Sequence, residues 1–162
     1  MTRPLASVLI VLCGLAAVGM AISTSATSAS TPPAEQAKAP TPSKPMKIRL
    51  IVDGTAVPAT LDASPSGRDF ATLLPLTLTL TDYGDVEKIS DLPRALSKEG
   101  APAGMDPEVG DITYYAPWGN LAIFVKDFSH SRGLIRLGRL DGDISPLKRK
   151  GALSVRIERV DP

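Results

Sequence analysis

Leu76-Thr77-Leu78-Thr79-Leu80-Thr81 is the most regular alternation of apolar and polar residues in this chain of 162 residues. In an extended strand, successive side chains point to opposite faces. The stretch would therefore place three leucines on one face and three threonines on the other. Threonine is β-branched and favours extended backbone. The sequence predicts a half-buried β-strand over residues 76–81.

The same period of two recurs on both sides of this stretch. It predicts further strands at residues 47–52, 55–61, 111–115, 121–125, 134–140 and 153–160. Asp53-Gly54 separates the first two as a hairpin turn, because both residues tolerate the positive φ that such a turn needs. Turn residues also separate the later strands, so we expect neighbouring strands to pair antiparallel.

Helical signals are few and short. Ser66 can cap a helix that runs through Leu74 and ends at Pro75, and Asp91 can cap a turn through Ser97. Seven or eight short strands with one or two helical pieces predict a mostly β fold. We favour a closed or nearly closed barrel, because closure removes exposed sheet edges, and a β-sandwich is the alternative.

Residues 1–29 have the composition of an export signal. Arg3 supplies a positive charge ahead of an apolar run over residues 5–22, and small residues offer cleavage sites after Ala26 or Ala29. We favour cleavage; the run is just long enough that an uncleaved membrane anchor is an alternative. A lipoprotein signal acylated at Cys13 is a weaker one. We expect an exported protein, periplasmic or extracellular.

Residues 30–45 have the composition of a linker, rich in Pro, Ala, Ser and Thr. Such a segment buries too little apolar surface to offset the entropy lost on ordering. We therefore expect one folded domain over residues 46–162, joined to the signal by this linker. Any membrane contact is expected only through the N-terminal segment, if that segment stays uncleaved.

Charge and composition exclude several classes of protein. The chain has 18 Lys and Arg against 17 Asp and Glu, and we expect no nucleic-acid partner because no basic stripe is present. Cys13 and His130 are the single cysteine and histidine, so one chain cannot assemble the usual zinc ligands. Phosphate-binding glycine loops and nucleophile-elbow motifs are missing from the sequence. We expect no metal and no cofactor.

Aromatic residues concentrate in one part of the chain. Of the seven aromatics, five lie within fifteen residues: Tyr114, Tyr115, Trp118, Phe124 and Phe128. The period of two predicts that Tyr114 and Tyr115 face opposite ways. One of the two would pack inward, and its neighbour would be exposed or covered by a loop.

Two interpretations of the aromatic cluster remain open. The first is ordinary core packing. The second is a shallow groove lined by Tyr115, Trp118 and Phe128, because aromatic rings with polar tips are favoured at binding surfaces. Arg94 and Arg139 are candidates for polar contacts in that groove.

Four segments resemble the prokaryotic cyclophilin-like proteins: Ala101-Pro-Ala-Gly-Met-Asp-Pro107, Gly110-Asp-Ile-Thr-Tyr-Tyr-Ala-Pro-Trp-Gly-Asn-Leu-Ala-Ile-Phe124, Lys126-Asp-Phe128 and Gly133-Leu-Ile-Arg-Leu-Gly138. These relatives are small stand-alone domains without a settled activity. The resemblance covers about residues 46–160. It implies a closed eight-stranded β-barrel with one or two short helices.

The resemblance implies less about activity. True cyclophilins isomerise the bond before proline with an arginine, a glutamine and an aromatic pocket. No Gln follows Gln36, and no motif match transfers the catalytic arginine to Arg94, Arg136 or Arg139. We expect a module that binds an extended or Pro-containing peptide or a small ligand. A weak peptidyl-prolyl isomerase with a non-standard site is the alternative, and a structural component of an envelope assembly is the third.

Overall fold

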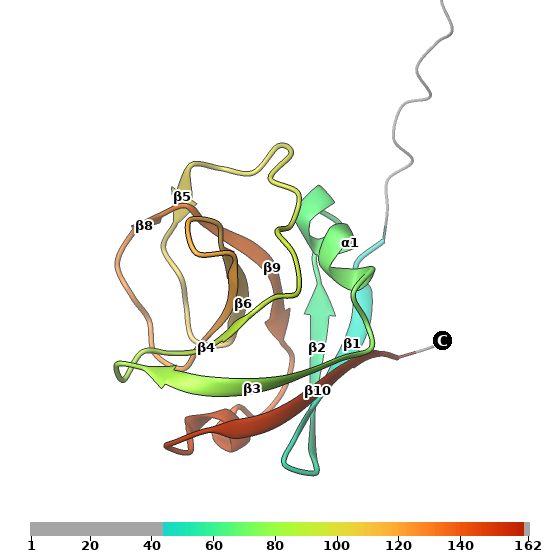
Figure 1. Cartoon of the computed structure of the whole chain (residues 1–162), viewed down its shortest axis with the longest axis vertical. Coiled ribbons are helices and arrows are strands. Elements are labelled where there is room, and N and C mark those ends of the chain that lie inside the picture. Colours follow the sequence, from blue (N-terminus) through green and yellow to red (C-terminus); the bar gives the residue numbers. More distant parts are fainter. Residues whose placement is uncertain (1–43, 161–162) are drawn as a thin grey trace, which may run out of the picture. The chain divides into compact units, whose positions relative to one another are not determined.

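Alternating strands close into a barrel within residues 44–160, the part of the chain that the computed structural model describes. The expected signal and nearly all of the expected linker lie outside these residues. Eight strands pair around the barrel in the order β1 (Met46–Val52), β10 (Leu153–Arg159), β3 (Leu76–Tyr83), β4 (Glu87–Asp91), β7 (Asn120–Phe124), β6 (Asp111–Tyr115), β9 (Leu134–Leu140) and β2 (Thr55–Leu61) (Figure 1). The closed barrel is confirmed, and the sandwich alternative was wrong.

The predicted alternation sets which side chains face the interior. In β3, Leu80 is fully buried, whereas Thr77 and Thr79 are exposed. The β1–β2 hairpin turns at Asp53 and Gly54, whose φ angles of 43° and 90° have the sign that a tight hairpin needs. The predicted strand β3 and the predicted β1–β2 hairpin are therefore confirmed.

One barrel strand, β4, was missed by the sequence analysis. Its interior-facing position is occupied by Lys88, which breaks the apolar pattern but is only 1% exposed. The ammonium lies 2.6 Å from the Asp82 carboxylate. It also donates to the carbonyl oxygens of Arg149 at 2.5 Å and Gly151 at 3.0 Å. A buried charge is tolerated when its hydrogen bonds are satisfied, as they are here.

The helix α1 (Pro65–Ala71) begins at a different serine from the predicted one. Ser64 is the N-cap, and its Oγ accepts a hydrogen bond from the backbone N–H of Gly67 at 3.0 Å. Pro65 suits the first helical position because its fixed φ is already helical. Ser66 is instead buried and donates to the carbonyl oxygen of Ser97 at 2.7 Å. The helix also ends three residues before the predicted Leu74.

The predicted helical turn from Asp91 to Ser97 was wrong. Asp91 is the last residue of β4, and no helix follows it up to Ser97. Strand pairing of Asp91 with Asn120 holds its backbone in an extended conformation, which a cap's local preference cannot overcome. A short 3-10 helix, η1 (Ser145–Lys148), forms elsewhere and buries Leu147.

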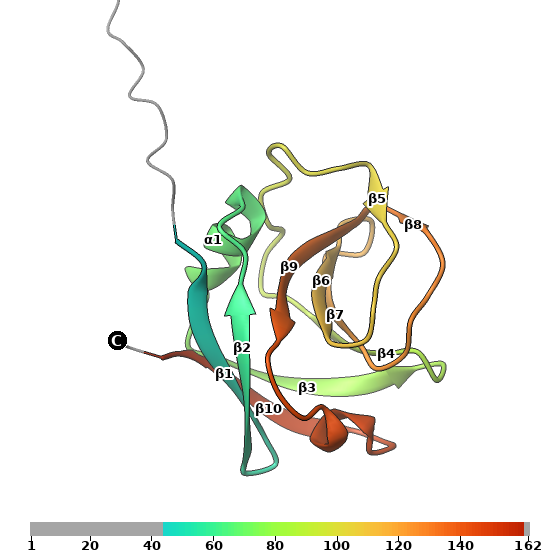
Figure 2. The ribbon, with the colours of Figure 1, turned by 180° about the vertical axis from the view of Figure 1, so that it is seen from behind.

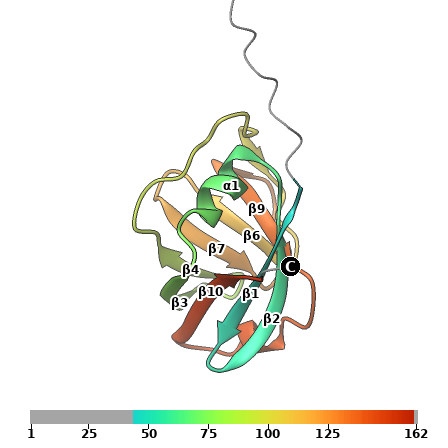
Figure 3. The same ribbon diagram turned by 90° about the vertical axis from the view of Figure 1, so that its right-hand side faces the viewer.

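The main core fills the barrel interior, and α1 contributes Phe70 and Ala71 to it. The helix α1 contacts β9 and β2, and Figure 3 shows it next to β9. A second, smaller cluster of Ala122, Phe124 and Leu134 lies on the outer face of the barrel wall. The short ladder of β5 (Gly104–Met105) and β8 (Ser131–Arg132) belongs to the loops beside this wall (Figure 2).

Candidate functional site

A pocket of about 330 Å³ opens on the outer face of the barrel wall. Its floor consists of outward-facing side chains of β4, β6 and β7, together with Leu134 at the start of β9. Its sides come from Tyr83 at the end of β3, Trp118 in the β6–β7 turn, and the loop that carries Phe128 and Ser131. The pocket adjoins the smaller apolar cluster rather than the main core.

Strand register brings the floor residues together. Tyr83 pairs with Glu87 across β3 and β4, and Glu87 pairs with Phe124 across β4 and β7. Residues paired in this way share one face of a sheet, and their Cβ atoms lie about 5 Å apart. The Glu87 carboxyl therefore stands between two aromatic residues, although 37 residues of chain separate it from Phe124.

Three aromatic rings meet at the rim of the pocket. The ring of Trp118 lies nearly perpendicular to the rings of Tyr83 and Tyr115, at centroid distances of 5.6 and 5.3 Å. A tight turn presents Trp118, because the N–H of Gly119 donates to the carbonyl oxygen of Tyr115 at 2.9 Å. The Trp118 side chain is 59% exposed and that of Phe128 is 51% exposed.

Tyr114 and Tyr115 face opposite sides of the wall, which confirms the predicted alternation. Tyr114 is buried in the main core, whereas Tyr115 packs against the outer cluster and lines the pocket. The structure thus contains both the core packing and the groove that the sequence left as alternatives.

Two polar groups in the pocket lack protein partners. Within residues 44–160, Glu87 makes no ion pair or side-chain hydrogen bond, and burial raises the pKa of its carboxyl above the usual range. Asn120 is 3% exposed, and its Oδ1 accepts no hydrogen bond. Its amide nitrogen makes only a long 3.4 Å contact with the carbonyl oxygen of Leu121. Buried polar groups normally find partners, so the Asn120 oxygen requires an explanation, and the partly buried Glu87 carboxyl is left to solvent or a ligand.

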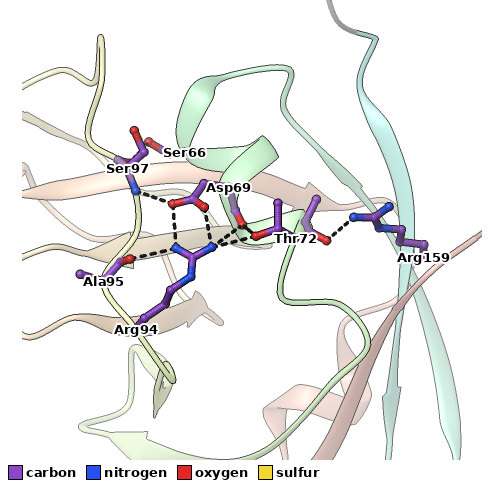
Figure 4. A network of polar contacts seen from close by, with 8 residues as sticks. Ser66, Asp69, Thr72, Arg94, Ala95, Ser97 and Arg159 are labelled. Carbon is purple, nitrogen blue, oxygen red and sulfur yellow. Dashed lines mark hydrogen bonds and ion pairs between the residues drawn. The ribbon is translucent and has the colours of Figure 1, made fainter.

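Arg94 lies outside the pocket lining and serves α1 instead. Its guanidinium forms a fork on the Asp69 carboxylate, with contacts of 2.6 and 3.0 Å, and donates to Thr72 Oγ1 at 2.8 Å. Figure 4 shows Arg94 facing Asp69, with the backbone N–H of Ser97 donating to the same carboxylate. The Arg94 bonds lower the pKa of Asp69. Arg94 therefore ties the chain after β4 to the helix.

Arg139 also lies outside the pocket lining. It donates to Glu108 Oε2 at 2.7 Å and to the carbonyl oxygen of Val109 at 3.0 Å, and it lies 3.5 Å from buried Asp111. Both predicted arginines thus pair with carboxylates. The structure brings Tyr115, Trp118 and Phe128 together around one pocket but places Arg94 and Arg139 elsewhere.

Tyr83, Glu87 and Asn120 are among the pocket residues that were not predicted from the sequence. Tyr83 had a usable signal, because the alternation of β3 continues to it and places it on the outward face with Thr79 and Thr81. Glu87 had no such signal, because its place in the pocket depends on β4, a strand that the pattern did not reveal.

Two further features bear on the chemistry of the described residues. Residues 44–160 hold no group of three or more His, Cys, Asp and Glu side chains placed to bind a metal ion. The same residues contain no helix of the length and apolar character that a membrane crossing requires.

Comparison with known proteins agrees with the barrel. A family model described as the cyclophilin-like family matches residues 50–158. Among solved structures, the solution structure of a hypothetical protein from Archaeoglobus fulgidus superposes with a TM-score of 0.57 and 23% identity, over 72% of this chain and 95% of that chain. That likeness shows the fold alone. No curated protein matches the chain.

Proposed function

This chain belongs to the cyclophilin-like family, and from that premise we propose that its barrel is a binding module whose outer-face pocket takes a small ligand or one side chain of an extended peptide. The observation that carries the proposal is the exposure of Trp118 and Phe128 around a formed pocket. When a ligand covers large aromatic side chains and removes them from water, the free energy of the system falls.

The size and lining of the pocket support this role. Its volume of about 330 Å³ falls at the lower end of the range of small-molecule sites, which is about 300–1,000 Å³. Apolar floor residues such as Ile89 and Leu134 combine with the unpartnered polar groups of Glu87 and Asn120. Such sites usually pair an apolar surface with a few polar groups that fix the orientation of the ligand.

Fluorescence of the full chain tests the proposal directly, because Trp118 is the single tryptophan and lines the pocket. We expect a saturable change in Trp118 emission when the chain is titrated with either a small-ligand panel or short Ala-Pro peptides. NMR shifts confined to the pocket residues would confirm the location. A silent Trp118 across both sets, with no NMR shifts, would overturn the binding role.

The isomerase alternative gains no support from the arginines that the sequence offered for it. Arg94, Arg136 and Arg139 each pair with a carboxylate, and none of them lines the pocket. The same Ala-Pro titration, recorded with exchange spectroscopy, tests this alternative. Faster interconversion of the cis and trans signals would favour the isomerase over a module that only binds.

We also propose that the barrel acts outside the cytoplasm, on the strength of the composition of residues 1–29. Cell fractionation followed by N-terminal sequencing tests this. Cleavage would give a mature chain that begins at Thr27 or Ser30. A full-length chain in the membrane fraction would favour the uncleaved anchor, and recovery in a large envelope complex would favour the structural role.

A further inference from the structure

We infer that the outer-face pocket recognises a small organic cation that carries a methylated ammonium group. This inference rests on the proposed binding role and adds the chemical class of the ligand. It combines three features of the described residues: the charge of the lining, the arrangement of the aromatic rings, and the apolar floor.

The charge of the lining favours a cation. Among the described residues that line the pocket, Glu87 is the only charged side chain, and no Lys, Arg or His is present. Lys88 follows Glu87 in the chain but faces the barrel interior, where it is fully bonded. Lys126 pairs with Asp85, and Arg132 follows the lining residue Ser131 without lining the pocket itself. The Glu87 carboxylate is therefore available to a positive ligand.

The aromatic rings favour the same ligand. Trp118 stands nearly perpendicular to both Tyr83 and Tyr115, and planes that meet near a right angle form corners. A cation in such a corner contacts more than one electron-rich ring, which is how aromatic cages bind quaternary ammonium groups. Because Glu87 lies between Tyr83 and Phe124 in the strand register, the carboxylate and the rings act on the same space.

The rest of the lining favours a methylated ammonium over a bare one. A bare ammonium needs several hydrogen-bond acceptors, as Lys88 has inside the barrel. The pocket floor instead presents Ile89, Phe124 and Leu134, which suit methyl groups.

A pair of matched probes separates charge from shape. Choline and its neutral isostere 3,3-dimethylbutan-1-ol have nearly the same size, and they differ in the positive charge. We expect choline to change Trp118 emission of the full chain saturably, with an affinity at least about tenfold higher than that of the isostere. Sodium chloride at equal ionic strength serves as the control for salt effects.

A matched pair of variants tests the role of Glu87. Glu87→Gln removes the charge and keeps the shape, and Glu99→Gln makes the same change at an exposed position outside the pocket. We expect Glu87→Gln to weaken choline binding by about fivefold or more and Glu99→Gln to leave it unchanged. Circular dichroism confirms that each variant is folded.

The outcomes distinguish this inference from the proposed function. Equal binding of choline and its isostere, unaffected by Glu87→Gln, would overturn the cation assignment and leave a neutral binding pocket. A response to Ala-Pro peptides alone would also overturn it, in favour of a peptide site. Binding to phosphatidylcholine vesicles without binding to free choline would replace the small cation with a lipid surface. A Trp118 that responds to none of these ligands would overturn the cation assignment, and silence toward the small-ligand panel as well, with no NMR shifts, would overturn the binding role.

Discussion

Lys88 and Glu87 are neighbours in β4 and point to opposite sides of the barrel wall. Lys88 is 1% exposed, and its ammonium contacts the Asp82 carboxylate and two carbonyl oxygens. Glu87 is half-buried beside aromatic rings, and within residues 44–160 no cation is paired with it. The interior charge has every partner it needs, whereas the outer charge has none.

This difference separates a structural charge from a functional candidate. A buried ion with satisfied hydrogen bonds holds strands and loops in place. A half-buried carboxylate without a partner is destabilising as it stands, and such groups concentrate at functional sites. Substitutions on the two sides of β4 test whether the strand divides its roles in this way.

Replacement of Lys88 by Met is expected to have the largest effect on stability. It leaves the carbonyl oxygens of Arg149 and Gly151 without this donor and Asp82 without its cation. The Asp82 side chain is 28% exposed, so water solvates the carboxylate that loses its cation. We therefore expect the free energy of unfolding to fall by about 2–3 kcal/mol, the cost of the unsatisfied carbonyl oxygens. Urea denaturation of the full chain measures this loss. Lys126→Met, at an exposed lysine, is the control, and a loss below about 1 kcal/mol for Lys88→Met would refute the structural role.

Replacement of Trp118 by Leu is expected to affect binding far more than stability. Choline affinity should fall at least about tenfold, since a strong cation–π partner is lost. The free energy of unfolding should change by less than about 1 kcal/mol, because more than half of the side chain is exposed. Calorimetry and urea denaturation measure the two effects. A large loss of stability with unchanged binding would assign Trp118 to packing.

Glu87→Gln is expected to increase stability at neutral pH, the opposite sign to Lys88→Met. Burial raises the pKa of Glu87 above the reference value of 4.5, so the folded state binds the proton more tightly than the unfolded chain. Wild-type stability therefore falls as pH rises through the folded-state pKa, and the variant lacks this loss. Thermal unfolding from pH 4 to pH 8 should show the gap opening with pH; parallel profiles would contradict the assignment.

Arg94→Ala is expected to have the smallest effect on the pocket. The arginine bonds to Asp69 and Thr72 on the helix side and lines no part of the pocket. Choline affinity should stay within about twofold of wild type, and stability should fall slightly because the pair is partly solvent-screened. The same calorimetric titration checks this. A clear loss of choline binding would show that the pocket extends further than its present lining.

Several parts of the fold were predictable from local pattern. The strand β3 and the Asp53-Gly54 turn are encoded locally, because neighbouring residues set the backbone conformation and the side of the sheet that each side chain faces. The strand β4 was not predictable in this way, because Lys88 occupies an interior position that pattern reasoning reserves for apolar residues. Its acceptance there depends on a carboxylate and two carbonyls supplied by other parts of the chain.

Local pattern also failed to predict which of two serines caps α1. Ser64 and Ser66 are both acceptable caps by residue type. The packing of Gly67 is close: a Cβ there would meet the carbonyl oxygens of Asp62 at 2.4 Å and Leu137 at 3.0 Å. Only glycine fits this close approach of the first turn of α1 to the neighbouring backbone. Ser66 lies inside the helix, and its hydroxyl donates to the carbonyl oxygen of Ser97, 31 residues along the chain.

Some residues of the candidate site were predictable from the sequence and others were not. The sequence brought Tyr115, Trp118 and Phe128 into one hypothesis because they are close along the chain, and they do line one pocket. It misplaced Arg94 and Arg139 because a long charged side chain pairs with whichever carboxylate the fold brings near.

The strands with clean alternation, the hairpin turn and the local group of aromatic residues follow from the sequence, because each depends on residues a few positions apart. The side-by-side placement of Tyr83, Glu87 and Phe124 on the outer wall depends on strand pairing between distant segments. Strand order and register depend on how the whole barrel closes and how its core packs. The pocket is a property of that closure, since its floor is assembled from strands that are distant in sequence.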